Sequence, residues 1–92
     1  MKNSNTNKNT AKKYNGHYNY ETFLVSLWID NDPNLYQLAH FCGKNNLDFE
    51  MFKTIVKPQK GDWEIDIKDW DNPAINVEEI NEKLQEFNDP NY

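Results

Sequence analysis

The sequence predicts an all-α protein with four helices packed around one aromatic-rich core. Apolar residues recur every three or four positions in four separate stretches, which is the spacing of helices with one buried face. Asparagine, aspartate, proline and glycine separate these stretches at positions that begin or end helices. No two stretches form a convincing pair of strands, and a single strand would leave its backbone hydrogen bonds unmade. The length of 92 residues fits one domain.

The first helix is expected to begin at Tyr20. Asn19 precedes it as an N-cap, and Asp30-Asn31-Asp32-Pro33 ends it, because a residue before proline avoids the α region. Its apolar stripe is predicted to consist of Tyr20, Phe23, Leu24, Leu27 and Trp28.

The second helix is expected to follow at once. Asp32 serves as its N-cap and Pro33 fits its first position. Gly43 is predicted to end it. The residues expected to face inward are Leu35, Leu38, Ala39 and Cys42.

A third helix is expected after Asn46 or Asp48, and it must end near Lys57 because Pro58 follows. Its inward residues are predicted to be Phe49, Phe52, Ile55 and Val56. The fourth helix has the clearest start, with Asn76 as N-cap and Glu79 in the capping-box position. Its stripe is Val77, Ile80, Leu84 and Phe87. The predicted core as a whole is Tyr20, Phe23, Leu27, Trp28, Phe49, Phe52, Ile80 and Leu84.

Residues 63–70 fit two patterns. Trp63, Ile65 and Ile67 alternate with charged residues, as in a strand, whereas Trp63, Ile67 and Trp70 have helical spacing. The lack of a partner strand favours a helix or an irregular packed segment. The alternative is a short strand around 63–67 that pairs with a second copy, so both a monomer and a homodimer stay open.

Charge is segregated along the chain. Residues 1–13 contain four lysines and no acid, and their composition predicts a disordered basic tail ahead of a compact domain over 14–92. Residues 62–92 contain ten acids and two lysines, a net charge of −8. This acidic third predicts a partner-binding surface made of Asp62, Trp63, Glu64, Asp66, Asp69, Trp70, Asp71, Glu78, Glu82 and Glu86. Three of these acids recur every four residues, at about 6 Å, close to the phosphate spacing of a nucleic-acid strand. The simpler alternative is a solvated helix face.

Catalysis, metal binding and cofactor binding receive little support, so we expect a protein that is not an enzyme. Cys42 and His40 are two positions apart and do not face each other on a helix. The three glycines are far apart and form no phosphate loop. One cysteine and two histidines cannot assemble a zinc site, and a single cysteine forms no intramolecular disulfide. With no signal peptide and no transmembrane stretch, we expect a cytoplasmic protein that does not contact membranes.

The basic tail supports a different hypothesis. Its four lysines predict weak, salt-sensitive contact with nucleic acid, and Tyr14 and Tyr18 follow with rings that can stack on bases. The rest of the chain has a net charge of −9 and would repel a polyanion.

Two segments carry a family resemblance. Asn19-Tyr20-Glu21-Thr22-Phe23 and Leu27-Trp28-Ile29-Asp30-Asn31 resemble the N-Y-E-T-W…L-W-x-x-N motif of small, largely uncharacterised phage and plasmid proteins. Residues 75–84 resemble the V-N/D-W-x-E-I-A-x-x-L segment near the end of those proteins, with Val77 and Asn81 departing from it. The structural residues of the first motif are Asn19, Tyr20, Phe23, Leu27 and Trp28.

The resemblance implies a mobile-element setting, in which small acidic proteins often block host defence. Combined with the acidic third, it predicts a counter-defence protein of the anti-CRISPR or antirestriction type. The expected partner is a host defence nuclease or another basic nucleic-acid-handling protein, bound through acidic mimicry of nucleic acid. The alternative is a nucleic-acid-associated accessory or regulatory protein that binds through the tail.

Overall fold

The fold is all-α, as the sequence predicts, and the computed structural model describes residues 14–90. Four α-helices follow one another along the chain: α1 (Tyr20–Asn31), α2 (Pro33–Lys44), α3 (Phe49–Val56) and α4 (Val77–Glu86). A short 3₁₀ helix, η2 (Asp62–Ile65), lies between α3 and α4. The described residues contain no strand beyond one isolated bridge between Tyr14 and His17. The tail predicted over residues 1–13 lies outside the described part.

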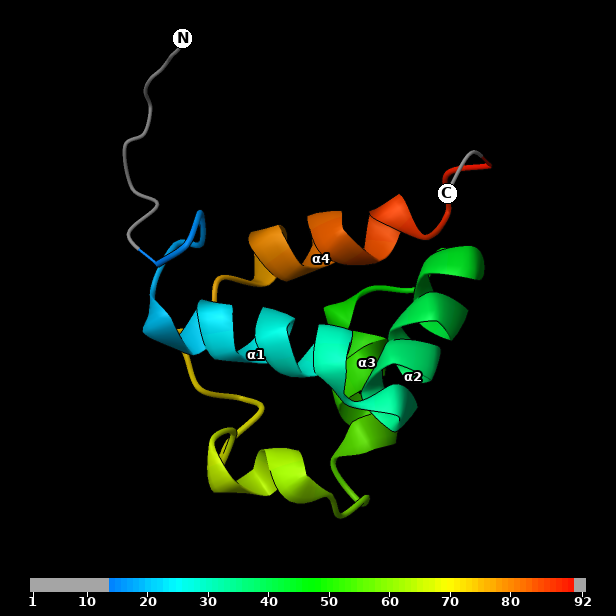
Figure 1. Ribbon diagram of the computed structural model, residues 1–92. Helices are drawn as coiled ribbons and strands as arrows, with labels where there is room; N and C mark the ends of the chain where they lie inside the picture. Colours follow the sequence, from blue (N-terminus) through cyan, green and yellow to red (C-terminus); the bar gives the residue numbers. More distant parts are fainter. Residues whose placement is uncertain (1–13, 91–92) are drawn as a thin grey trace, which may run out of the picture.

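Two helices, α2 and α4, each contact the other three α-helices. Figure 1 shows α4 above α1 and η2 below it, so that α1 separates the last helix from the preceding segment. None of the helices within residues 14–90 is long and apolar enough to cross a membrane.

The helix starts agree with the sequence prediction. The Asn19 side chain accepts from the Thr22 N–H at 2.9 Å, and the Asp32 side chain accepts from the Asn34 N–H at 2.9 Å. Asp48, one of the two candidates, caps α3. The Asn76 side chain accepts from the Glu79 N–H at 3.0 Å. Each cap satisfies a backbone donor that the first turn leaves without a helical partner.

Gly43 does not end α2, which continues to Lys44. Its role is to let α2 approach α4 closely. A Cβ atom at Gly43 would lie 2.1 Å from the Leu84 carbonyl oxygen and 2.7 Å from the Phe87 Cβ atom. Any larger residue would therefore push the two helices apart.

The predicted inward stripe of α1 is mostly wrong, since only Leu24 and Trp28 of its five residues pack against the core. The buried face is formed by Thr22, Val25, Ser26 and Ile29, whereas Tyr20 is 49% exposed and Leu27 is 39% exposed. Phe23, Leu24 and Trp28 are only partly buried. Both faces of α1 carry apolar residues at helical spacing, so spacing alone does not select the buried one.

The core residues predicted for the other helices are largely confirmed. Phe49, Phe52, Ile80 and Leu84 are fully buried, and the full set of buried apolar side chains is Val25, Ile29, Leu35, Ala39, Cys42, Phe49, Phe52, Val56, Trp63, Ile67, Trp70, Ile75, Ile80, Leu84 and Phe87. The exceptions are Leu38, Ile55 and Val77, since Leu38 and Ile55 are partly buried and Val77 is exposed.

Residues 63–70 form a packed segment in which only the η2 turn is helical. Trp63 and Trp70 are 4% and 5% exposed, and their rings meet edge to face at 5.2 Å. Trp70 also contacts the rings of Phe49 and Phe52. Ile65 is 75% exposed, so the alternation that suggested a strand does not correspond to a buried and a solvated face.

Candidate protein-binding surface

The starts of α1 and α4 are connected by partly buried polar contacts. The Asn19 amide donates to the Ala74 carbonyl at 2.5 Å. The Thr22 hydroxyl accepts from the Asn76 N–H at 2.8 Å, and Thr22 is fully buried. The start of α1 is thereby fixed to the start of α4. The two segments that carry the family resemblance meet here in space.

Glu79 strengthens this connection in a way the capping-box pattern does not predict. Its carboxylate accepts from the Tyr18 backbone N–H at 2.8 Å and also contacts the His17 ring. The Asn76 N–H that a capping-box glutamate would accept from is bound by Thr22 instead. Glu79 therefore holds the N-terminal segment against α4.

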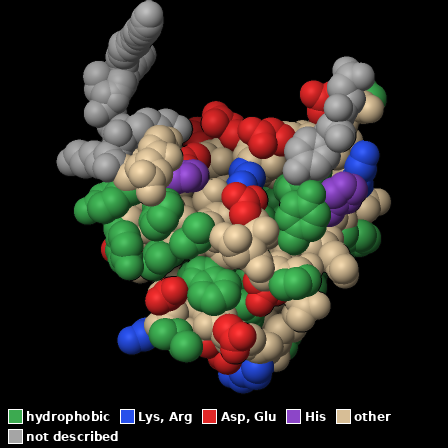
Figure 2. Space-filling view, viewed as in Figure 1, with side chains coloured by type: hydrophobic (Ala, Val, Ile, Leu, Met, Phe, Trp, Pro, Cys, Tyr) green, Lys and Arg blue, Asp and Glu red, His purple; other side chains and the backbone are tan. Residues whose placement is uncertain are grey.

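The outer face of α4 presents three exposed carboxylates, Glu78, Glu82 and Glu86, which we call the α4 ladder. Figure 2 shows acidic side chains gathered at the top of the molecule, over α4. Within residues 14–90, none of the three carboxylates forms an ion pair or a side-chain hydrogen bond. Lys83, on the same helix, pairs with Asp30 of α1 at 2.8 Å. Within the described part of the chain, the ladder is therefore exposed and without an ionic partner.

The spacing of the ladder carboxylates lowers the stability of α4. Glu78 and Glu82, and again Glu82 and Glu86, are like charges four residues apart, which destabilises a helix by about 0.2–0.5 kcal/mol per pair. Glu86 also lies in the last turn of α4, where the helix dipole disfavours an anion. Glu78 lies in the first turn, where the dipole favours an anion, so helix stability leaves only Glu82 and Glu86 without an explanation.

The acids of residues 62–71 are arranged differently, and Asp71 is the clearest case. Its carboxylate binds Lys57 and, at 3.0 Å, Lys53. These hydrogen bonds, that from Lys57 first, lower the pKa of Asp71 below its ordinary value. Burial acts to lower the pKa of Lys53, but hydrogen bonds to Glu50 and Asp71 outweigh it and raise that pKa. Asp71 therefore links residues 62–71 to α3.

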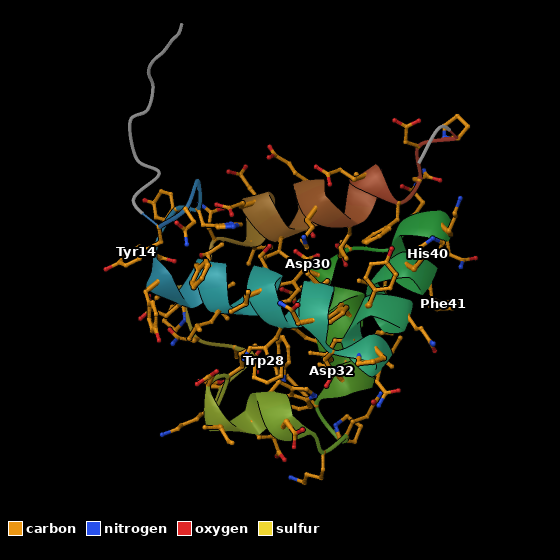
Figure 3. All side chains as sticks on the ribbon, in the orientation of Figure 1. Tyr14, Trp28, Asp30, Asp32, His40 and Phe41 are labelled. Atoms are coloured by element: carbon orange, nitrogen blue, oxygen red, sulfur yellow. The ribbon has the colours of Figure 1, made fainter. Side chains whose placement is uncertain are left out.

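Three further acids of this segment have partners inside the protein. Asp66 accepts from the Trp28 indole N–H at 2.8 Å, and Figure 3 shows Trp28 between α1 and the segment below it. Glu64 pairs with Lys60 at 3.3 Å, and Asp69 accepts from the Asp71 N–H at 2.9 Å. Asp62 is the one acid of the five that makes no such contact within the described residues, and its side chain is exposed.

The ten residues predicted as one partner surface are therefore divided. Trp63 and Trp70 are core residues and cannot act as surface anchors in this conformation. Figure 1 shows the segment of residues 62–71 and the helix that carries the ladder, α4, on opposite sides of α1. The acids of residues 62–71 and the α4 ladder therefore do not form one continuous binding face.

Cys42 is fully buried in α2, which agrees with its predicted role in the core. Burial, with a smaller contribution from the nearby Asp48 carboxylate, raises the pKa of its thiol. The ring of His40 contacts those of Tyr36 and Phe87. No group of three His, Cys, Asp or Glu side chains within residues 14–90 is arranged to hold a metal ion.

The chain belongs to a family of unknown function, DUF7249, whose model matches residues 10–90. Searches of curated proteins and of solved structures find no match. The family match covers the whole described domain, including both segments that meet at Asn19 and Asn76.

Proposed function

We propose that this protein is a mobile-element counter-defence protein that binds a basic, nucleic-acid-handling host protein through the α4 ladder. The row of Glu78, Glu82 and Glu86 would occupy a groove that normally holds a nucleic-acid strand. The anti-CRISPR and antirestriction settings both fit this mode of action, because their targets carry such grooves.

One observation carries the proposal: the three ladder carboxylates are exposed and have no ionic partner within the described chain, although their spacing disfavours the helix. Residues that break a local rule without helping the fold are expected at functional sites. Their spacing of about 6 Å matches the phosphates of one strand, which supports a basic groove as the target.

The test is a pull-down from a host lysate with the tagged full-length chain, with and without nuclease treatment. We expect a nuclease-resistant complex with one basic, nucleic-acid-handling protein. The variant Glu78→Lys/Glu82→Lys/Glu86→Lys should lose that complex while keeping its helical circular-dichroism spectrum. Retention of the complex by the triple variant would rule out mimicry through the ladder.

A matched pair of single variants separates the ladder from overall charge. Glu82→Lys and Asp62→Lys change the net charge equally, and both residues are exposed without an ionic partner in the described part. Binding through the ladder predicts a larger loss of affinity for Glu82→Lys. Equal losses would mean that the partner responds to net charge alone.

A second candidate function is nucleic-acid binding by an accessory or regulatory protein through the basic tail. It is favoured by Tyr14 and Tyr18, whose rings are exposed next to that tail. The tail itself lies outside the described residues. Deleting residues 1–13 should abolish salt-dependent binding to single-stranded DNA if this function is correct, and should leave the protein complex intact if the ladder carries the function.

A further inference from the structure

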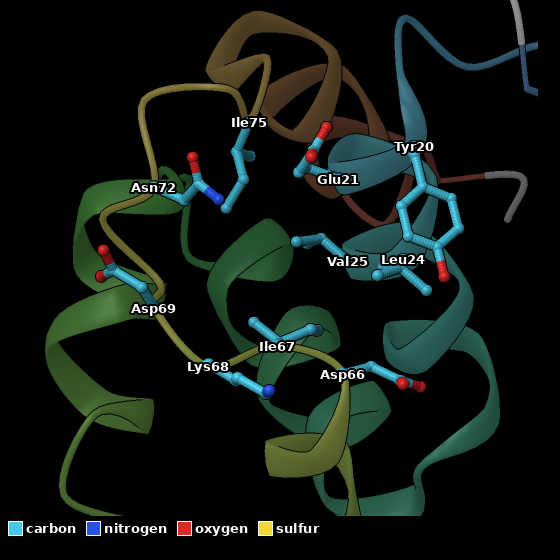
Figure 4. A pocket seen from close by; sticks show the side chains of 10 residues that line it. All are labelled: Tyr20, Glu21, Leu24, Val25, Asp66, Ile67, Lys68, Asp69, Asn72 and Ile75. Atoms are coloured by element: carbon cyan, nitrogen blue, oxygen red, sulfur yellow. The ribbon is translucent and has the colours of Figure 1, made fainter.

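A pocket of about 230 Å³ lies between α1 and residues 66–75, on a different flank of α1 from the one that packs on α4. Its floor is apolar and consists of Leu24, Val25, Ile67 and Ile75. Figure 4 shows these side chains at the centre and polar groups around them. The pocket is smaller than the roughly 300–1,000 Å³ that encloses a drug-sized molecule, so its size fits one inserted side chain.

The rim of the pocket is acidic. It carries Glu21, Asp66 and Asp69 with one cation, Lys68, which gives a net charge of −2. The Glu21 carboxylate, at the start of α1, has no ionic or hydrogen-bond partner within residues 14–90. An apolar floor with this rim disfavours acidic ligands and nucleic acid, and it favours a cationic ligand with an apolar part.

The neighbouring surface of α1 extends the apolar area. Tyr20 lines the pocket and is 49% exposed, and its ring packs against Phe23, with centroids 6.4 Å apart. Figure 2 shows apolar side chains gathered over the start of α1. An apolar anchor site beside exposed aromatic rings, surrounded by charge, is the usual composition of a protein-binding patch.

We propose that this pocket is a docking site for a short basic segment of a partner protein. One apolar side chain of the segment, leucine or methionine, fills the floor. Flanking lysines or arginines pair with Glu21 and Asp69 on the rim. The proposal goes beyond the function assigned to the α4 ladder, since it involves a different surface and needs none of the ladder residues.

The test uses the full-length chain labelled with ¹⁵N and two synthetic peptides. In the first peptide, one leucine is flanked on each side by two lysines. In the second, serine replaces the leucine. We expect the leucine peptide to bind about tenfold more tightly, because it alone buries an apolar side chain. Its addition should shift the amide signals of Tyr20, Leu24 and Ile67. Equal affinities, no binding, or shifts confined to α4 would each overturn the proposal.

Matched variants locate the contacts. Leu24→Lys places a cation inside the pocket and should weaken binding of the leucine peptide about tenfold, whereas Leu27→Lys, outside the pocket on the same helix, should change it less than about twofold.

Glu21→Gln should weaken peptide binding more than Glu78→Gln, which removes the same charge from the α4 ladder. The opposite order would show that the ladder holds the peptide. That outcome overturns the pocket proposal and leaves the function of the ladder standing. Circular dichroism of each variant checks that the fold is kept.

Discussion

The α4 ladder and residues 62–71 are both strongly acidic, yet the fold uses their acids in opposite ways. Glu78, Glu82 and Glu86 point to solvent without partners in the described chain, whereas Asp66 and Asp71 bind side chains of α1 and α3. The backbone explains the difference. A helix satisfies its own backbone hydrogen bonds, so the outward side chains of α4 are not needed to hold it. Most of residues 62–71 are not helical, and their position depends on buried tryptophans and polar side-chain contacts.

The sharpest way to test this comparison is to remove a core residue from residues 62–71. Trp70→Ala should lower the free energy of unfolding by about 3–5 kcal/mol, because a large buried ring leaves a cavity beside Phe49 and Phe52. Chemical denaturation measures the loss. Ile65→Ala, at an exposed position of the same segment, should stay within about 0.5 kcal/mol. Similar effects of the two variants would contradict the packed structure of this segment.

A second test concerns the inner face of α4, which the fold does need. Gly43→Ala should destabilise the protein by about 1–3 kcal/mol, because the added methyl group would clash with the Leu84 carbonyl oxygen. The melting temperature should fall clearly. Lys44→Ala is the control, since Lys44 is the exposed neighbour on the same helix. A stable Gly43→Ala variant would show that α2 and α4 do not pack at this distance.

Much of the helical framework can be predicted from local sequence. Asp32 and Pro33 end α1 and begin α2 through a side-chain cap and a ring geometry that act within a few residues. The boundary between the two helices can therefore be predicted from the sequence. The same holds for the caps at Asp48 and Asn76. The four-residue spacing of the ladder also suffices to place its acids on one helix face.

The orientation of α1 could not be predicted in this way. Its apolar residues cover most of its circumference, and its buried face includes a polar residue, Thr22, which binds the Asn76 N–H, 54 residues away. Long-range pairs of this kind leave no local pattern. For the same reason, sequence spacing did not reveal that Asp71 binds Lys53 and Lys57, or that the acidic third is divided between two sides of the molecule.

The ion pairs of Asp71 should make the stability of the protein depend on pH. Asp71 has a lowered pKa, so its contribution to stability is present above the ordinary value of 3.8 and is lost as the pH falls through the lowered value. Lys53 has a raised pKa, so its contribution is present below 10.5 and is lost as the pH rises through the raised value.

Asp71→Asn should therefore be less stable than the wild type at neutral pH, and the difference should shrink at both acidic and alkaline extremes. Urea denaturation at about pH 7, 3 and 11 measures it. Asp62→Asn is the control, because Asp62 has no ionic partner within the described residues. A difference that does not change with pH would mean that the Asp71 ion pairs do not form in solution.

The smallest expected effect is the most informative about the ladder. Glu82→Gln removes two like-charge neighbours at four-residue spacing and should stabilise the protein by about 0.4–1 kcal/mol. Glu78→Gln is the matched control. It removes one repulsion, but also a charge that the N-terminal end of the α4 dipole favours, so its net effect should be near zero. The gain from Glu82→Gln should diminish in about 1 M salt, where charges are screened within about 3 Å. A loss of stability in Glu82→Gln would show that the fold itself needs the ladder, and the main structural reason for assigning it to a partner would disappear.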